Sequence, residues 1–394
     1  MWWILKLCVF PNDPIRTYFE KGEIKERYYN PGNFFDRVDL ITLVDEDIQV
    51  SQVQRLVGNA KLRIFSVGKI GIRDRKKHVK AIIELVGTIK PDVIRAYNPL
   101  IEGWLAASCA KKLKIPFWVS LHTQFDYNRK IVKKTNLKKY LVLKYTEKFI
   151  EPFVLKTADK ITAVYKIIVP YVLNHSSKKP EILYNKVDCE RFSKSQPIDS
   201  LPSPLIISVG SLIQVKNHQC LIKAIKDIDA HLLIVGNGEL YGELINLIKK
   251  LMLENKITII KSIPNNQIQN YYKSAQIFAL AYNPEIESIP IPVMEAMASG
   301  LPVVIPFPKE GFSEGLENIA IFAEQNPESF AKNFQKLLDD SKLREEYAEK
   351  AKVKSLDFDN KKIEKRESQI YSELLEDKGD TCDENFSQNT NSSI

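Results

Sequence analysis

The stretch "PEIESIPIPVMEAMASGLPVV", residues 284–304, decides the fold. Its second half is apolar almost all round from Ile291 to Ala298, and Gly300 and the apolar run 302–305 follow. A helix without a polar face is normally buried. The pattern therefore predicts a short buried helix that leads through a glycine turn into a buried strand.

Two glutamates interrupt this apolar stretch. Glu295 lies inside the predicted helix, and Glu287 lies eight residues earlier, before Pro290 and Pro292 mark a first turn. Burying a carboxylate without a partner costs several kcal/mol. Glu295 must therefore complement the helix dipole, meet a buried Arg or Lys, or bind a ligand.

Apolar strands alternate with amphipathic stretches along the rest of the chain, which is the pattern of parallel α/β layers. In the first half we expect strands at 3–10, 38–43, 62–67, 93–96, 117–121 and 161–164, with helices at 76–89, 101–113 and 136–156. A second series of strands follows at 205–209, 231–235, 257–260, 277–281, 302–305 and 320–322. Two Rossmann-like sheets are predicted, with a ligand cleft between them at the carboxyl ends of the strands.

The segment 193–204 is rich in Ser and Pro, which indicates a linker. We therefore predict a first domain at 1–195, a linker at 196–204 and a second domain at 205–358. A C-terminal helix at 359–376 follows, and 377–394 form a disordered tail because almost nothing apolar remains there.

The composition is that of a soluble globular protein, since 27% of the 394 residues are charged and 44% are apolar. The N-terminal "MWWILKLCVF" has no basic segment before its apolar run, so we expect a first buried strand rather than a signal peptide. The five cysteines form no CxxC pair, which argues against a disulfide framework and against a zinc site. These features favour a protein of the reducing cytoplasm.

Charge is divided unevenly between the halves. Residues 1–200 hold 36 Lys and Arg against 21 acidic residues, a balance of +15, whereas residues 201–394 have a balance of −7. Such asymmetry indicates either an anionic partner for the first half or a solvated basic face.

Two glycine turns follow predicted strands in the second half. In "LIISVGSLIQVKNHQCLIKAI" (205–225) a turn and a loop with Lys216 precede a helix, where a lysine is well placed to hold a phosphate. In "LLIVGNGEL" (232–240), Gly236 and Gly238 allow close backbone approach. Taken singly, each of these turns is more often an ordinary surface loop than a phosphate site.

The order of these turns and the glutamate pair resembles that of the retaining GT-B glycosyltransferases of family 4, the group 1 transferases. The resemblance covers roughly residues 60–355. The matching segments are "VGSLIQVKN", "IVGNGEL", "ESIPIPVMEAMASGLPVV", "FSEGLENIAIFAEQNPESFAKNFQKLLDD", "DVIRAYNPLIEGWLAA", "VSLHTQFD", "KTADKITAVY" and "ILYNKVDCERF". It implies an α/β protein with the GT-B fold, in which two Rossmann-like domains turn their parallel sheets towards a central cleft.

The resemblance assigns roles to particular residues. In that family the second glutamate, here Glu295, receives the ribose hydroxyls of a nucleotide-sugar, and the first, Glu287, contacts the transferred sugar. Lys216 stabilises the departing diphosphate, and His122, at a strand end where a lone histidine is otherwise structural, lies near the donor sugar. The catalytic residues implied are Glu287, Lys216 and His122. The implied nucleotide-sugar contacts are Glu295, Gly210, Ser211, Gly236, Ser288, Ile289, Pro290, Ile291 and Asn185.

The sequence departs from the family pattern at three places. The usual Arg after the first glycine is Ser211 here, which leaves Lys216 as the cation for the phosphates. The family's "NGVD" is replaced by residues 185–188, where Lys186 either compensates or occupies a surface turn. The N-terminal glycine-rich loop is replaced by the longer segment 19–38.

The implied activity is transfer of a hexose-type sugar from a nucleotide-sugar, bound by the second domain, to a saccharide or lipid-linked acceptor, bound by the first. Retention of anomeric configuration is implied, without a covalent enzyme intermediate, a cofactor or a metal, in cell-envelope glycan or glycolipid synthesis. Two alternatives stay open. One is a non-catalytic GT-B-like subunit or scaffold, which Ser211 would suit. The other is a dinucleotide-dependent oxidoreductase, disfavoured because no GxGxxG motif opens either sheet.

The stretch 128–149 interleaves lysines with Leu137, Leu141, Tyr145 and Phe149, spaced four apart as on one side of a helix. One interpretation is a helix packed on the first domain with a lysine-rich outer face. The other is contact with an anionic membrane, which would make a cytoplasmic enzyme peripheral to the membrane. A nucleic-acid partner is not expected, because no nucleic-acid-binding module is recognisable.

Overall fold

The computed structural model describes residues 4–388, which form two compact units. Within these residues, the first unit comprises 4–164, 168–183 and 364–388, and the second comprises 165–167 and 184–363. Each unit is an α/β layer structure around one parallel sheet. The prediction of two Rossmann-like parallel sheets is confirmed.

The sheet of the first unit has seven parallel strands in the order β3-β2-β1-β4-β5-β6-β7. Six of them lie where the apolar runs predict them, and the seventh was missed because it has only two residues. The strands are β1 (Lys6–Phe10), β2 (Arg37–Thr42), β3 (Lys61–Ser66), β4 (Val93–Ala96), β5 (Phe117–Leu121), β6 (Lys160–Ala163) and β7 (Glu181–Ile182). The predicted first strand also includes residue 3, which lies outside the described residues.

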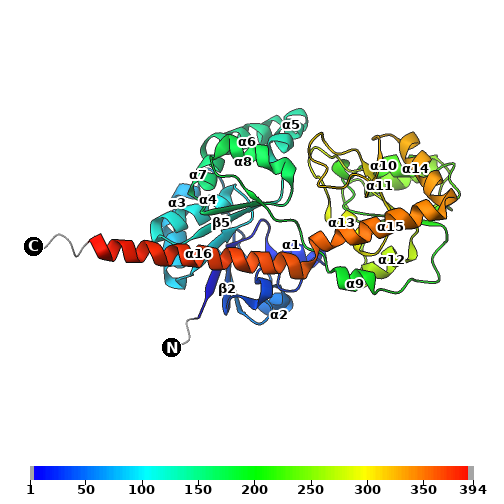
Figure 1. Ribbon diagram of the computed structural model, residues 1–394. Helices are drawn as coiled ribbons and strands as arrows, with labels where there is room; N and C mark the ends of the chain where they lie inside the picture. The colour runs from blue at the N-terminus through cyan, green and yellow to red at the C-terminus, as the bar shows by residue number, and fades with distance from the viewer. Residues whose placement is uncertain (1–3, 389–394) are drawn as a thin grey trace, which may run out of the picture. The chain divides into compact units, whose positions relative to one another are not determined.

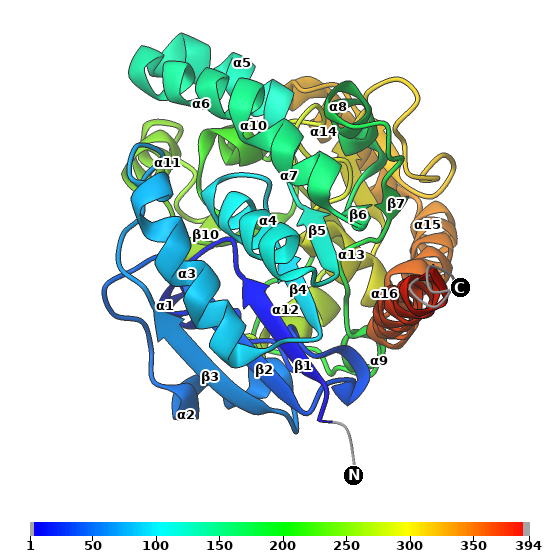
Figure 2. The ribbon, with the colours of Figure 1, turned by 90° about the vertical axis from the view of Figure 1, so that its left-hand side faces the viewer.

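Helices cover both faces of this sheet. On one face, α3 (Arg75–Ile89), α4 (Ile101–Leu113) and α7 (Glu151–Thr157) lie side by side (Figure 2). On the other face, α16 (Asn360–Gln388, red in Figure 1) packs through Tyr371, whose ring centroid lies 4.9 Å from that of Trp118 in β5. The remaining elements of this unit are α1 (Ile15–Glu20), α2 (Val50–Val53), α5 (Phe125–Thr135), α6 (Leu137–Phe149), α8 (Val169–His175), η1 (Pro31–Asn33) and η2 (Gln54–Val57). The short helix η3 (Lys166–Ile168) lies at a unit boundary, with residues 166 and 167 in the second unit.

The sheet of the second unit has six parallel strands in the order β10-β9-β8-β11-β12-β13. All six lie at the predicted positions to within two residues. They are β8 (Leu205–Val209), β9 (His231–Val235), β10 (Ile257–Ile260), β11 (Ile277–Ala279), β12 (Val303–Pro306) and β13 (Ile321–Ala323). Their near-continuous apolar sequences fit strands that are covered on both faces.

The helices of the second unit form two layers. On one face α10 (His218–Ala224) contacts α11 (Tyr241–Lys250) and α14 (Pro327–Asp339). On the other face α13 (Ile291–Ala298) contacts α9 (Cys189–Ser193), α12 (Ile268–Ser274) and α15 (Ser341–Ser355). The short helices η4 (Gln214–Lys216) and η5 (Leu356–Phe358) complete the unit.

The unit boundaries differ from the predicted domain boundaries. Residues 184–195, placed in the first domain by the sequence, belong to the second unit because Val187 pairs with its last residues. The Val187 amide donates to the Phe358 carbonyl at 2.9 Å, and the Asn360 amide donates to the Val187 carbonyl at 2.8 Å. The chain enters the second unit at residue 184. The Ser- and Pro-rich segment 193–204, which predicts a linker, therefore lies within that unit.

The C-terminal helix is longer than predicted. It runs to Gln388, past residue 377 where the sequence analysis places the start of a disordered tail. No proline lies between residues 360 and 388, so the backbone keeps every helical hydrogen-bond donor despite the polar composition. The rest of the predicted tail, 389–394, lies outside the described residues.

Candidate active site

Helix α13 shows how its apolar sequence accommodates Glu295. Val293, Met294 and Ala296 are buried, whereas Glu295 is half-exposed. Its Oε2 accepts a hydrogen bond from the Tyr272 hydroxyl at 3.0 Å. Burial, and then the Glu295 charge, raise the pKa of Tyr272 well above its usual value, so this hydroxyl stays a proton donor.

The structure brings Glu287 and Lys216 together. Lys216 ends η4 after β8, and its Nζ lies 2.5 Å from Oε2 of Glu287 in the loop before α13. The two loops are also tied by backbone, since the Asn283 amide donates to the Val215 carbonyl at 2.9 Å. The Lys216 side chain is mostly buried, so this ammonium needs a carboxylate or another anion beside it.

The glycine turns after β8 and β9 pack directly against each other. A Cβ added at Gly236 would lie 2.0 Å from the Gly210 carbonyl oxygen, and one at Gly238 would lie 2.4 Å from that of Leu212. The Gly210 amide donates to the Val235 carbonyl at 3.0 Å. Glycine at 236 is therefore required by the approach of these two turns, independently of any ligand.

The start of α13 brings Ser288, Ile289, Pro290 and Ile291 into one buried or half-buried turn. The Ser288 carbonyl accepts a hydrogen bond from the buried Tyr282 hydroxyl at 2.6 Å. The first amides of a helix have no intrahelical acceptor, and prolines carry no amide hydrogen. Ile291 opens α13, and Ser288 and Ile289 come just before its cap residue Pro290, so their amides are the donors that an anion could use here.

Asn185 lies near the same residues through Tyr165. Its Nδ2 donates to the Tyr165 hydroxyl at 3.5 Å, and Glu287 is, after burial, the main cause of the raised pKa of Tyr165. Ser211 is exposed at the Gly210 turn. Every predicted site residue except His122 thus belongs to the second unit.

His122 directly follows β5 in the first unit and is half-buried. Its ring stacks on that of Tyr97, with centroids 5.6 Å apart and planes at 30°. Tyr97 follows β4, so the two rings meet at the carboxyl ends of neighbouring strands.

His218, the first residue of α10, was missed by the sequence analysis. It is buried, its Nδ1 lies 3.3 Å from Ser208 Oγ, and its Nε2 would lie 3.7 Å from a Cβ on Gly210. Burial lowers its pKa to about 4, so a neutral imidazole supports the Gly210 turn. A single histidine within "VKNHQC" has no spacing that reveals this role.

We expect the lowered pKa of His218 to make stability depend on pH. The unfolded chain binds a proton near pH 6.5 that the folded protein does not bind until about pH 4. The resulting contribution to the free energy of unfolding, up to about 3 kcal/mol, is complete above pH 6.5 and is lost as the pH falls towards 4. Urea unfolding of the parent and His218→Asn at pH 7 and pH 4.5 measures it. The parent should lose more stability than the variant over this interval, and equal losses would exclude His218 as the cause.

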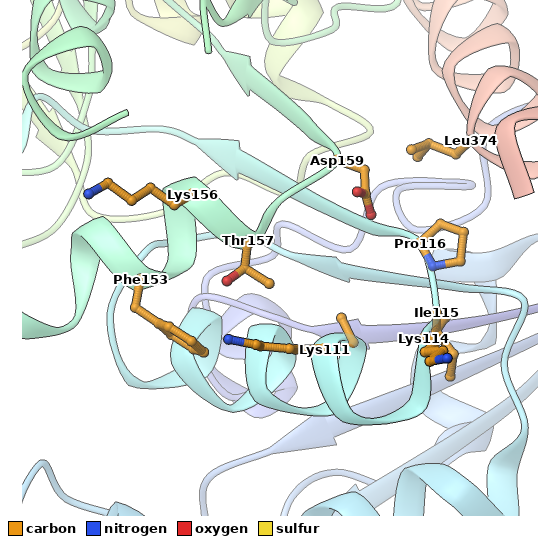
Figure 3. Close-up of a pocket in the computed structure, with 10 residues that line it drawn as sticks. Lys111, Lys114, Ile115, Pro116, Phe153, Lys156, Thr157, Asp159 and Leu374 are labelled. Atoms are coloured by element: carbon orange, nitrogen blue, oxygen red, sulfur yellow. The ribbon is translucent and has the colours of Figure 1, made fainter. Parts of the chain in front are cut away.

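A cavity of about 780 Å³ lies within the first unit (Figure 3). Lys111, Lys114 and Lys156 line it together with Phe153 and Leu374. It is located at the amino ends of β5 and β6, where α4 and α7 end, and lysines at helix C-termini offset the helix dipole. None of the predicted site residues lines it, and ligands of such sheets bind at the opposite, carboxyl ends.

Comparison with known families agrees with this arrangement. Residues 190–354 match the glycosyl transferases group 1 family, and residues 36–191 match glycosyltransferase family 4. The chain belongs to the group 1 glycosyltransferases. The first of these matches includes α13 and both glycine turns.

Several proteins are similar to this group 1 glycosyltransferase. The N-acetylgalactosamine-N,N'-diacetylbacillosaminyl-diphospho-undecaprenol 4-alpha-N-acetylgalactosaminyltransferase of Campylobacter jejuni is 36% identical over 194 residues, 48% of this chain and 52% of that protein. The chain therefore matches about half the length of this relative. An uncharacterized glycosyltransferase of Haemophilus influenzae is 26% identical over 81% of this chain and 84% of its own.

The fold is shared with the Anabaena protein HepE, solved in complex with UDP and glucose. The TM-score is 0.69 at 16% identity, covering 94% of this chain and all of that one. The two parallel-sheet units are thus those of the GT-B fold.

Proposed function

We propose that this protein transfers a sugar from a nucleotide-sugar to a saccharide or lipid-linked acceptor, with retention of anomeric configuration, in cell-envelope glycan or glycolipid synthesis. The observation that carries the proposal is the pairing of Lys216 with Glu287, next to α13 and its Glu295. The presence of UDP in HepE and the diphospho-undecaprenol acceptor in the Campylobacter relative's name support it.

Glu295 would bind the ribose of the donor. A vicinal diol offers two O–H donors, and a carboxylate accepts both through charge-assisted hydrogen bonds. Tyr272 occupies Oε2 from the buried side of α13, which fixes the carboxylate in one orientation. Glu295 is only partly buried, so a ligand can approach this side chain from solvent.

Lys216 would stabilise the diphosphate as it leaves. Negative charge grows on the leaving group while positive charge grows at the anomeric carbon, so a fixed ammonium lowers the barrier. The amides of Ser288, Ile289 and Ile291 would add donors at the start of α13. Because Lys216 is already held by Glu287, the diphosphate must share or replace that carboxylate.

Glu287 would act on the sugar itself. A carboxylate beside the ring stabilises an oxocarbenium-like transition state, as in other glycosyl reactions. We propose that the reaction proceeds without a covalent enzyme intermediate and without a metal ion, with Lys216 in the charge-neutralising role.

Release of nucleoside diphosphate from a panel of UDP-, GDP-, dTDP- and CMP-sugars tests the proposal, with NMR detection of the anomer formed. We expect at least one donor to be cleaved and the released sugar to retain its anomeric configuration at early times. Inversion would exclude the retaining mechanism. Binding without any cleavage would favour a non-catalytic subunit, and binding of NAD(P) alone would favour an oxidoreductase.

The acceptor proposal includes contact with an anionic membrane through the α5–α6 hairpin, residues 125–149. The apolar side chains that the packed-helix interpretation would bury are exposed, with Leu137, Leu141 and Phe149 at 64%, 61% and 53%. Lysines surround them, at positions 133, 134, 138, 139, 144 and 148. An apolar stripe flanked by lysines is complementary to an anionic lipid surface.

A polar network, rather than the apolar stripe, holds this hairpin on the first unit. The Arg129 guanidinium donates to the buried Glu151 carboxylate at 2.9 Å, and Thr146 and Tyr171 donate to it at 2.7 and 2.5 Å. Tyr145 of the stripe contacts Arg75, which donates to its hydroxyl at 2.8 Å, whereas Leu137, Leu141 and Phe149 stay exposed. Within residues 4–388, no helix has the length and apolar composition needed to cross a bilayer.

Vesicle sedimentation tests the membrane proposal. We expect the parent to sediment with anionic vesicles at low salt and to be released as salt shortens the screening length to ~8 Å. Replacing Lys133, Lys134, Lys138 and Lys139 with Gln should abolish sedimentation, since each lysine near anionic lipid contributes about 1 kcal/mol. Nucleotide binding should not change.

A charge-matched control changes four exposed lysines of α11 and α14, Lys249, Lys250, Lys332 and Lys336, to Gln. This variant should sediment like the parent. If the parent does not bind anionic vesicles at low salt, the membrane proposal is wrong and a soluble acceptor remains.

A further inference from the structure

Four aromatic rings, one of them that of His122, form a row in the first unit. Tyr18 lies in α1, Tyr28 in the loop after it, and Tyr97 and His122 directly follow β4 and β5. Ring centroids are 6.3 Å apart for Tyr18–Tyr28, 5.8 Å for Tyr28–Tyr97 and 5.6 Å for Tyr97–His122. We call these four residues the aromatic row. Because β1, β4 and β5 are neighbours, the row lies at the carboxyl edge of the sheet, where ligands bind.

Contacts with neighbouring residues hold Tyr97, the ring between Tyr28 and His122, in place. The Arg95 guanidinium lies 4.6 Å from the Tyr97 ring centroid and donates to Glu367 of α16 at 2.9 Å. The Tyr97 amide also donates to the Phe10 carbonyl at 3.2 Å. A ring held in this way loses little conformational freedom on binding a ligand.

The outer rings are not part of the buried core. Tyr97 is buried, whereas Tyr18, Tyr28 and His122 are only partly buried and keep some surface accessible to solvent. Rings needed only for core packing would be covered, because an exposed ring forgoes part of its burial free energy. Burial raises the pKa of Tyr28 to about 12, so its hydroxyl remains a neutral hydrogen-bond donor.

Amide and carboxylate groups border the row. Asn12 accepts from the Asn98 side chain at 3.1 Å and donates to Asp13 at 2.9 Å. Asp13 lies two residues before α1, the helix that carries Tyr18. The Asp13 carboxylate can accept hydrogen bonds from hydroxyls and repels a phosphate or carboxylate placed beside it.

We propose that the aromatic row, with Asn12 and Asp13, is a subsite for a neutral sugar ring of the acceptor. This inference rests on the proposed glycosyl transfer. One face of a pyranose is formed by C–H groups and packs on an aromatic ring, while its hydroxyls lie at the edge. An anionic part of the acceptor would lie away from Asp13, and the lysines of the α5–α6 hairpin offer one surface for it.

Saturation-transfer NMR with methyl glycosides tests the subsite, because these probes carry no aromatic group of their own. The panel contains the methyl glycosides of glucose, galactose, mannose, their 2-acetamido derivatives and glucuronic acid. We expect at least one neutral probe to receive saturation from the full-length protein and the glucuronide to receive less. Tyr28→Ala should lower the affinity about tenfold, whereas Tyr28→Phe should retain it.

Two further variants keep the outcome decisive. Tyr18→Ala removes a second ring of the row, and Tyr347→Ala removes a half-exposed tyrosine of α15 in the other unit as a control. UDP and GDP titrations of every variant report folding and donor binding separately. If the parent binds neither UDP nor GDP, the proposed donor site is overturned but the subsite is not. The subsite is overturned if no neutral probe binds the parent, or if binding survives both alanine substitutions in the row.

Discussion

We expect Lys216→Ala to reduce turnover about a hundred- to thousandfold, because it removes the group that neutralises the departing diphosphate. Nucleotide affinity should fall as well, since the same ammonium contacts the bound diphosphate. The substitution also leaves the Glu287 carboxylate without the partner that lies 2.5 Å away in the structure. Steady-state kinetics with the cleaved donor and titration with its nucleoside diphosphate measure the two effects.

Glu287→Gln is the matched counterpart of this variant. It should depress turnover about a hundredfold but leave nucleotide affinity equal to that of the parent or higher, because Lys216 is freed from its carboxylate. The opposite pattern, weak nucleotide binding with normal turnover, is incompatible with the roles given to this pair. Glu285→Gln changes a half-exposed carboxylate in the same loop and should have little effect on either quantity.

The second large effect concerns Glu295. We expect Glu295→Gln to weaken binding of the nucleoside diphosphate roughly tenfold to a hundredfold, since losing a charged acceptor costs about 1.5–3 kcal/mol. The fold should persist, because glutamine has the same shape and its amide oxygen can still accept from Tyr272. Calorimetric titration measures the loss, and thermal unfolding checks the fold.

A ribose-modified ligand separates this role from a general loss of charge. If Glu295 binds the ribose diol, a 2′-deoxynucleotide should bind the parent more weakly than the ribonucleotide does. The affinity lost through Glu295→Gln should then be smaller with the 2′-deoxynucleotide than with the ribonucleotide. Additive effects would place the carboxylate away from the ribose. Tyr272→Phe keeps the carboxylate and removes only its orienting hydrogen bond, so its effect should be smaller than that of Glu295→Gln.

The sequence predicts most of the fold because each strand is an apolar run that both helix layers cover. The β8 and β9 runs end in glycines, and Gly236 shows why, since a Cβ there would meet the Gly210 carbonyl oxygen. What the sequence missed depends on contacts between distant residues. β7 has two residues, and Val187 joins the second unit through Phe358 and Asn360, more than 150 residues later.

The same limit applies to the sites. The glutamate pair and Lys216 stand in recognisable motifs, and the structure brings Lys216 and Glu287 together across 71 residues. His218 and Tyr272 carry no such signal, because their roles follow from burial and from one hydrogen-bond partner each. The apolar spacing of α6 predicts a stripe on one side of a helix, but only the structure shows that this stripe faces solvent, because Arg129 and Glu151 hold the hairpin instead.

Nucleotide titration shows whether the second unit binds a nucleotide-sugar through Lys216 and Glu295. UDP, GDP, their sugar conjugates and NAD(P) are titrated into the full-length parent, Lys216→Ala and Glu295→Gln under identical conditions. We expect at least one nucleoside diphosphate to bind the parent and both variants to bind it at least tenfold more weakly. This expectation is contradicted if no nucleoside diphosphate binds the parent, or if both variants bind it as the parent does.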